Sequence, residues 1–195
     1  MNSREKILAA VKQNQPPLVP LPDYSALKQY SAPNPTQFME TLQLIGGKVV
    51  EVNSIDEVIA YLQANYAADA RKVSTIPELQ SIAQKADHTI IPQHLEDVVV
   101  AIIKAQFGVA ENGAVWVTEN EMEIRALPFI ATNLAVVLPK TNIVNTMHEA
   151  YDKIGSMDYG FGGFIAGPSK TADIEQSLVL GAHGPKSMTV FLIGN

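Results

Sequence analysis

Short, continuously apolar segments alternate along this chain with segments of helical spacing, and this alternation most constrains the fold. Residues 98–103 and 134–138 are apolar at almost every position, which is typical of strands buried on both faces. Between such strands, residues 55–62 place apolar side chains on one helical face, behind a Ser54/Glu57 capping box. The sequence therefore predicts an α/β fold, a Rossmann-like and mostly parallel sheet with helices on both faces.

The same patterns give the approximate positions of the elements. We expect helices at about residues 4–14, 38–45, 54–62 and 143–154, and a short helix from Pro77. Expected strands are residues 48–52, 72–76, 89–91, 98–103, 114–117, 134–138, 164–166 and 189–193. In a parallel sheet, ligands bind beyond the carboxyl ends of the strands, so loops that follow strands are the first places to look for a site.

Two unequal parts are expected. Six prolines between Pro16 and Pro35 remove backbone donors and disfavour helix, which indicates an extended arm after the first helix. We therefore divide the chain into residues 1–34, an N-terminal helix and proline-rich arm, and residues 35–195, one α/β domain. A chain of 195 residues is of ordinary size for a single core.

Charge and composition narrow the function classes. The net charge of −6 disfavours a general attraction to nucleic acid or anionic lipid. The apolar run at 98–103 is far shorter than the ~20 residues of a membrane span, and the charged N-terminus lacks a secretory core, so we expect a cytoplasmic protein. Cysteine is absent, which excludes disulfides, cysteine nucleophiles and all-cysteine iron–sulfur sites within this chain.

The first candidate site is the turn Glu111-Asn112-Gly113, directly before an apolar strand. An Asn-Gly pair favours a tight turn with positive φ. One interpretation is a β-turn with a solvated carboxylate. The other is a catalytic Glu111 that acts as a nucleophile or base, with nearby backbone amides stabilising negative charge.

A second candidate loop follows the predicted strand 164–166. Ser169 or Thr171 can cap a helix that we expect to begin here, and two acidic residues suit the positive end of its dipole, which explains the loop structurally. In the functional interpretation the helix N-terminus binds a small carboxylate or phosphate, with Lys170 and Lys186 offsetting the acidic charge. The candidate ligand-binding residues here are Gly167, Pro168, Ser169, Thr171, Asp173 and Glu175.

His183 is the third candidate, held between Gly181 and Gly184, where backbone can approach a ligand closely. It is either a catalytic acid–base group or an exposed loop histidine. Although Asp173, Glu175 and His183 are competent metal ligands, their spacing does not demand a metal, and we assign none. The sequence also lacks the dinucleotide and phosphate-loop glycine motifs.

The stretch Gly167-Pro-Ser-Lys-Thr-Ala-Asp-Ile-Glu175, followed by Gly181-Ala-His-Gly-Pro185, resembles the lactate-utilisation protein C, or LUD-domain, family. The turn at Glu111, together with Arg125, also matches family positions, which makes Arg125 a further candidate ligand-binding residue. The resemblance covers roughly residues 35–195. At Asn133 the chain departs from relatives with histidine, so no acid–base role is transferred to it.

This resemblance implies a fold similar to ribose-5-phosphate isomerase, glucosamine-6-phosphate deaminase and CoA transferases. It also implies an accessory or assembly subunit in the oxidation of L-lactate to pyruvate, with no cofactor in this chain and iron–sulfur clusters on partner subunits. The alternative is a CoA-transferase-like or other small-anion-binding enzyme that uses Glu111, because Ala110-Glu-Asn-Gly113 is similar to the Ser-Glu-Asn-Gly turn of CoA transferases. A binding domain without catalysis and a homo-oligomer are further alternatives.

Overall fold

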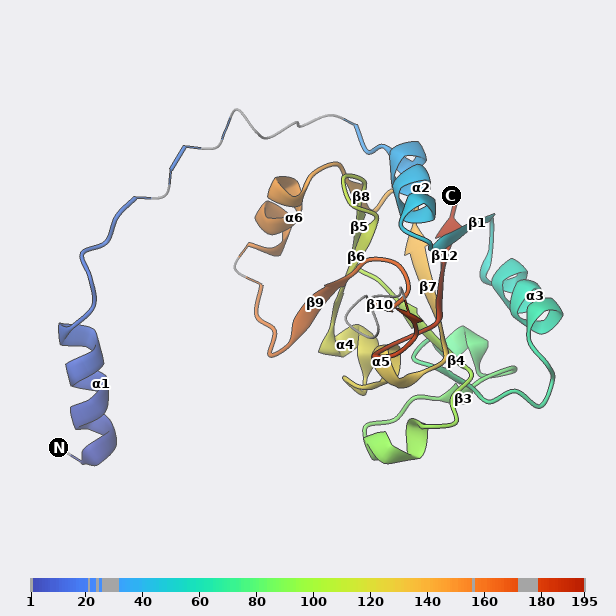
Figure 1. Cartoon of the computed structure of the whole chain (residues 1–195), viewed down its shortest axis with the longest axis horizontal. Coiled ribbons are helices and arrows are strands. Elements are labelled where there is room, and N and C mark those ends of the chain that lie inside the picture. Colours follow the sequence, from blue (N-terminus) through green and yellow to red (C-terminus); the bar gives the residue numbers. More distant parts are fainter. Residues whose placement is uncertain are drawn as a thin grey trace.

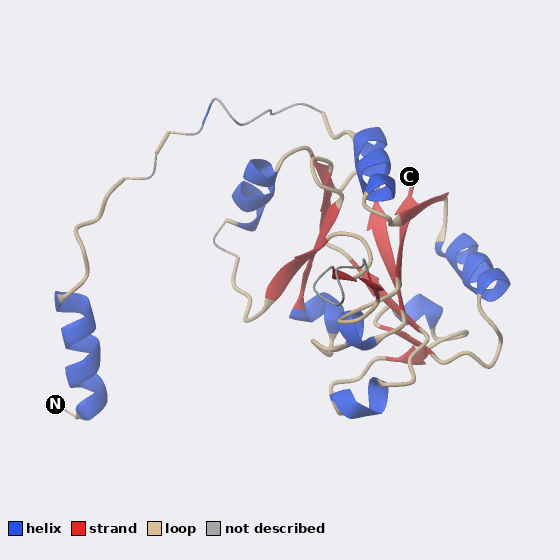
Figure 2. Cartoon of the chain, viewed as in Figure 1, coloured by secondary structure: helices blue, strands red, loops and turns tan. Residues whose placement is uncertain are grey.

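A six-stranded parallel sheet, here called sheet A, forms the centre of the protein (Figures 1 and 2). The computed structural model describes residues 2–20, 22–23, 25, 32–155, 157–171 and 179–194. Every neighbouring pair of strands in sheet A is parallel. In spatial order the strands are β1 (Lys48–Val52), β12 (Ser187–Ile193), β7 (Asn133–Pro139), β4 (Val100–Lys104), β2 (Lys72–Ser74) and β3 (Gln84–Lys85). This confirms the predicted α/β fold.

Four further strands form a separate sheet, here called sheet B. Their order is β8 (Ile143–Val144), β5 (Phe107–Val109), β6 (Ala114–Thr118) and β9 (Gly162–Ile165). The β5/β6 and β6/β9 pairs are antiparallel, whereas β5/β8 is parallel. A two-stranded ribbon joins β10 (Lys170–Thr171) to β11 (Val179–Leu180). The predicted strands at 114–117 and 164–166 therefore belong to a second sheet rather than to the central one.

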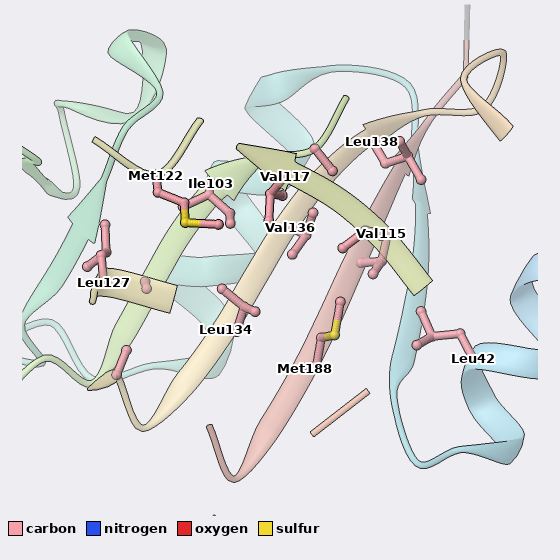
Figure 3. Packing of buried hydrophobic residues seen from close by; sticks show 14 of the residues in the cluster. Leu42, Ile103, Val115, Val117, Met122, Leu127, Leu134, Val136, Leu138 and Met188 are labelled. Carbon is pink, nitrogen blue, oxygen red and sulfur yellow. The ribbon is translucent and has the colours of Figure 1, made fainter. Parts of the chain in front are cut away.

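The two faces of sheet A have different covers. Leu134, Val136 and Leu138 of β7 face helix α2 (Pro35–Leu44) and the β6 residues Val115 and Val117, as Figure 3 shows. Ala135 and Val137 face the opposite side, where they pack with helix α3 (Ile55–Asn65) and the 3-10 helix η2 (Pro77–Leu79). This alternation places one layer of helix and one layer of sheet on opposite sides of the same strands.

Sheet B is itself covered on its outer side. There Phe107 and Trp116 pack with Ala150 and Ile154 of helix α6 (Met147–Ile154). All five residues of β6 are consequently buried. A continuously apolar strand can thus belong to an antiparallel sheet when that sheet is enclosed between two layers.

Hydrogen bonds explain two differences from the predicted elements, one through strand pairing and one within a turn. The helix expected from residue 143 begins at Met147, behind the N-cap Thr146, because Ile143 and Val144 pair with β5 as strand β8. The strand expected at 89–91 is a turn in which Thr89 N donates to Asp87 Oδ1 and Ile90 N to the Asp87 carbonyl.

The remaining helices are short or lie apart. They are α1 (Ser3–Gln13), α4 (Glu119–Met122), α5 (Leu127–Ile130) and the 3-10 helix η3 (Pro92–Leu95). Helix α1 begins behind the N-cap Asn2, but none of its residues is buried and Figure 1 shows it away from the sheets. Among the described residues, every helix is too short or too polar to span a bilayer.

Candidate functional site

The Glu111 turn is the tight connection between β5 and β6. Gly113 adopts φ +68° and its amide donates to the Val109 carbonyl at 2.9 Å. Ala114 N donates to Asn112 Oδ1 at 3.0 Å, a side-chain bond that closes the turn. The positive φ that the Asn-Gly pair predicts is therefore present at Gly113.

The Glu111 carboxylate is exposed but has a defined partner. Its Oε2 accepts a hydrogen bond from Met147 N at 2.7 Å, and the Glu111 amide donates to the Asn145 carbonyl at 3.0 Å. Met147 is the first residue of α6, where backbone amides lack partners within the helix. The Glu111 carboxylate and amide thus connect the start of α6 to sheet B through hydrogen bonds.

The loop that starts at Gly167 follows β9 of sheet B and folds back on helix α2. Gly167 has φ +73°, and a Cβ there would lie 3.0 Å from the Ile45 carbonyl oxygen. The same carbonyl accepts a hydrogen bond from Lys170 Nζ. Residues 170–171 form strand β10 rather than the first turn of the expected helix, and Asp173 and Glu175 lie outside the described residues.

Backbone hydrogen bonds tie this loop to the segment that contains His183. Ser169 N donates to the Pro185 carbonyl at 2.9 Å, and Gly181 N donates to the Ser169 carbonyl at 3.0 Å. A Cβ on Gly184 would lie 3.1 Å from the Ser169 Cβ. The structure therefore brings the Gly167–Ser169 and Gly181–Pro185 segments side by side, with His183 exposed at the surface.

The His183 loop lies at the amino ends of the strands of sheet A. It leads directly into β12, and Lys186 N donates to the Thr132 carbonyl immediately before β7. Asn133 lies at the same edge and accepts a 2.6 Å hydrogen bond from Ser187 Oγ. The sequence predicts a site at the carboxyl ends of the strands, and this loop lies at the opposite edge of sheet A.

Ile45 connects the Glu111 turn to the Gly167 loop. The ideal Cβ positions of Gly113 and Gly167 lie 3.3 Å and 3.4 Å from the Ile45 Cδ1 atom. The three candidate segments thus form one chain of contacts around the end of α2. Within the described residues, no hydrogen bond or ion pair joins the Glu111 carboxylate to the His183 imidazole.

Arg125 lies in a different cluster. Its guanidinium stacks over the Phe161 ring at 5.4 Å. Glu119 accepts hydrogen bonds from the Gly160 and Phe161 amides, each at 2.5 Å. Its own backbone amide, those two amides and, more weakly, Arg125 hold the pKa of the Glu119 carboxyl below its usual value, while burial opposes them. The contacts of Arg125 are those of a residue that fixes the loop before β9.

The described part of the chain contains no group of three or more histidine, aspartate or glutamate side chains placed to hold a metal ion. His183 has no such companions among these residues, and the two acidic residues considered with it are not described.

A cleft of about 600 Å³ opens at the carboxyl edge of sheet A. Thr75 follows β2, Lys104 ends β4 and Asn142 follows β7, so its polar lining comes from successive strand ends. This is where ligands bind in open parallel sheets. The sequence does not single out this lining because its residues carry no motif, although several of them directly follow predicted strands.

Hydrogen bonds hold part of the cleft lining in place. Gln106 Nε2 donates to both carboxylate oxygens of Glu121 at 3.1 Å, and Glu121 also accepts from Thr118 N and Oγ1 at 2.8 Å. Asn142 Nδ2 donates to the Gln106 carbonyl at 3.1 Å. The polar rim is therefore organised before any ligand arrives.

The fold and these two surfaces define the class of protein: an α/β protein with an all-parallel sheet, a glycine-rich loop cluster at its amino edge and a cleft at its carboxyl edge. Within that class, the chain belongs to the LUD domain family, whose family model matches residues 66–193, or 128 of the 195 residues. This segment includes every described strand except β1.

Curated relatives match a smaller part of the chain. Lactate utilization protein C of Anoxybacillus flavithermus is 38% identical over 85 residues, which cover 43% of this chain and 39% of that protein. Lactate utilization protein C of Bacillus subtilis is 30% identical over 119 residues, which cover 58% of this chain and 49% of that protein. The matched segments thus span less than half the length of these relatives.

A solved structure supports the fold. The crystal structure of a DUF162 family protein from Deinococcus radiodurans superposes with a TM-score of 0.60, covering 82% of this chain and 95% of that chain. The sequence identity is 17%, so the similarity is one of fold.

Proposed function

We propose that the protein takes part in lactate utilisation, as an accessory or assembly subunit in the oxidation of L-lactate to pyruvate. Similarity to proteins named Lactate utilization protein C is the observation that carries the proposal. Because the chain contains no cysteine, iron–sulfur clusters of the all-cysteine type would have to reside on partner subunits.

The proposed contact surface for a partner or a small ligand is the amino-edge loop cluster, which is formed by the segments Gly167–Ser169 and Gly181–Pro185. His183, Leu180 and Phe129 are exposed there, and the Phe129 carbonyl lies 3.9 Å from the ideal Cβ of Gly184. The described part of this surface places exposed aromatic and aliphatic side chains beside an imidazole, which suits a protein contact because interfaces are enriched in aromatic residues.

Affinity purification of the full tagged chain from cells grown on L-lactate tests this proposal. We expect iron–sulfur proteins to co-purify, and His183→Ala to reduce their recovery by about tenfold, the effect of losing one interface anchor. His88→Ala is the matched control, because His88 is also an exposed histidine but lies beside Asp87, outside this cluster. The proposal is refuted by two results together: the tagged chain purifies alone, and deletion of its gene leaves lactate oxidation unchanged.

A further inference from the structure

The carboxyl-edge cleft combines apolar walls with amide side chains. Val137, Pro139 and Ile193, from the ends of β7 and β12, provide apolar surface. Gln106 and Asn142 provide hydrogen-bonding groups on the same lining. A volume of about 600 Å³ lies within the range of small-molecule sites, roughly 300–1,000 Å³.

The amides have hydrogen-bonding capacity left over for a ligand. Gln106 uses its Nε2 donors on Glu121, but its Oε1 accepts no hydrogen bond from the described residues. The Asn120 side chain likewise has no hydrogen-bond partner among them, although its backbone amide donates to Thr118 Oγ1. A ligand in the cleft would thus meet both amide acceptors and amide donors.

The charges of the lining disfavour a polyanion. Among the described residues of the lining, Lys104 is the only cation, and its Nζ lies 3.7 Å from Glu78 Oε1, so the positive charge is already paired. Glu121 adds a second carboxylate, so the described residues of the lining have a formal charge of −1. A triphosphate or a CoA ester would be repelled by this balance, whereas an uncharged molecule would not.

An adjoining hollow of about 310 Å³ shares Gln106 and Asn120 with the cleft and adds Met157, Asp158 and Tyr159. Tyr159 is 38% exposed, and its ring lies edge-on against Trp116, with 5.5 Å between the ring centroids. An exposed aromatic ring beside amide side chains favours a planar ring that can both stack and form hydrogen bonds. Asp158 strengthens the argument against a polyanion.

We propose that this cleft is a binding site for an uncharged heteroaromatic ring of the nucleobase or nicotinamide type. Gln106 and Asn120 recognise polar atoms on the edge of the ring, and Tyr159 contacts its face. This proposal stands independently of the role in lactate oxidation, because it rests on the linings of the cleft and of the adjoining hollow.

Isothermal titration calorimetry tests the proposal by measuring the dissociation constants of the full chain for adenosine, guanosine, uridine, nicotinamide and ATP. At least one of the four uncharged compounds should bind below about 1 mM, and at least about tenfold more tightly than ATP. If all four bind more weakly than that, or if ATP binds as tightly as the best of them, the proposal is wrong.

Two variants locate the binding. Asn120→Trp places a bulky ring at an exposed position that lines both the cleft and the adjoining hollow. Tyr159→Ala removes the aromatic face. Each should weaken the best ligand by at least about tenfold while the variant remains folded by circular dichroism. Gln93→Trp is the matched control, since it replaces an exposed amide in η3, outside the cleft. Equal losses in the control, or none in either cleft variant, would overturn the assignment.

Discussion

Gly113 occupies a position where the backbone leaves no room for a side chain. Its φ of +68° lies in the left-handed region, and a Cβ would lie 2.9 Å from the backbone N and Cα of Leu42. Neither atom can move without shifting helix α2. Glycine is therefore required here for two reasons, conformation and close approach.

Gly113→Ala should accordingly lower the free energy of unfolding by at least about 2 kcal/mol, through left-handed strain and the contact with α2. Urea denaturation measures this change. Gly163→Ala is the matched control, because no heavy atom lies within 4 Å of its ideal Cβ and its φ is not positive. The two variants should differ clearly, and similar stabilities would contradict the packing of α2 on this turn.

The residues of the candidate site were only partly predictable. The Asn112-Gly113 turn follows from local chemistry, which a sequence pattern contains. The hydrogen bond from Met147 N to Glu111 and the neighbouring positions of Ser169 and Pro185 depend on tertiary packing, which it does not contain.

At the scale of elements, α4 illustrates how a short helix is held by its connections. Thr118 and Glu121 form a capping box at its start. Glu119, in its first turn, accepts hydrogen bonds from the Gly160 and Phe161 amides and so attaches the helix to the segment before β9. Four residues would not form a stable isolated helix, so these contacts keep α4 in place.

The lowered pKa of Glu119 makes this attachment dependent on pH. A carboxyl whose pKa is lower in the folded state stabilises the fold above its unfolded-state pKa and loses that contribution as pH falls through the folded-state value. Glu119→Gln should therefore reduce stability at pH 7, with a difference from the parent chain that narrows towards about pH 3. Urea denaturation across this range measures it.

Glu96→Gln provides the comparison, because Glu96 is an exposed glutamate outside this cluster. Its stability should follow that of the parent chain at each pH. A Glu119→Gln difference that stays constant or grows on acidification would show that another interaction is responsible.

Sheet B marks the limit of element prediction from this sequence. The pattern at 114–118 correctly indicates a buried strand, but burial on both faces arises equally in a parallel sheet covered by helices and in an antiparallel sheet enclosed by sheet A and α6. The partner of a strand is not written in its own residues. For the same reason, the sequence pattern predicts a helix at Ile143, whereas this residue pairs with Gly108 in sheet B.

At the scale of the whole molecule, the α/β class follows from the sequence because strand and helix periodicities differ. Leu134, Val136 and Leu138 face one side of sheet A while Ala135 and Val137 face the other, so β7 had to be covered on both faces. The location of the site did not follow, since the glycine-rich segments lie at the amino edge and the cleft at the carboxyl edge.

Helix α1 is the part of the described molecule that contributes least to this core. Its apolar residues Ile7, Leu8 and Val11 are each more than half exposed, and none of its residues is buried. A chain that begins at residue 32 should therefore unfold within about 2 °C of the full chain, because surface changes alter stability little. Differential scanning calorimetry at equal protein concentration measures both melting temperatures.

Phe38→Ala in the full chain shows that the measurement can detect a core defect. Phe38 is fully buried in α2 against the core of sheet A, and its truncation should cost about 3–5 kcal/mol and lower the melting temperature by roughly 6–20 °C. If removing residues 1–31 lowers the melting temperature as much as Phe38→Ala does, helix α1 packs on the domain or on a second copy in solution. An unchanged melting temperature leaves α1 available for a different partner, such as the subunits proposed above.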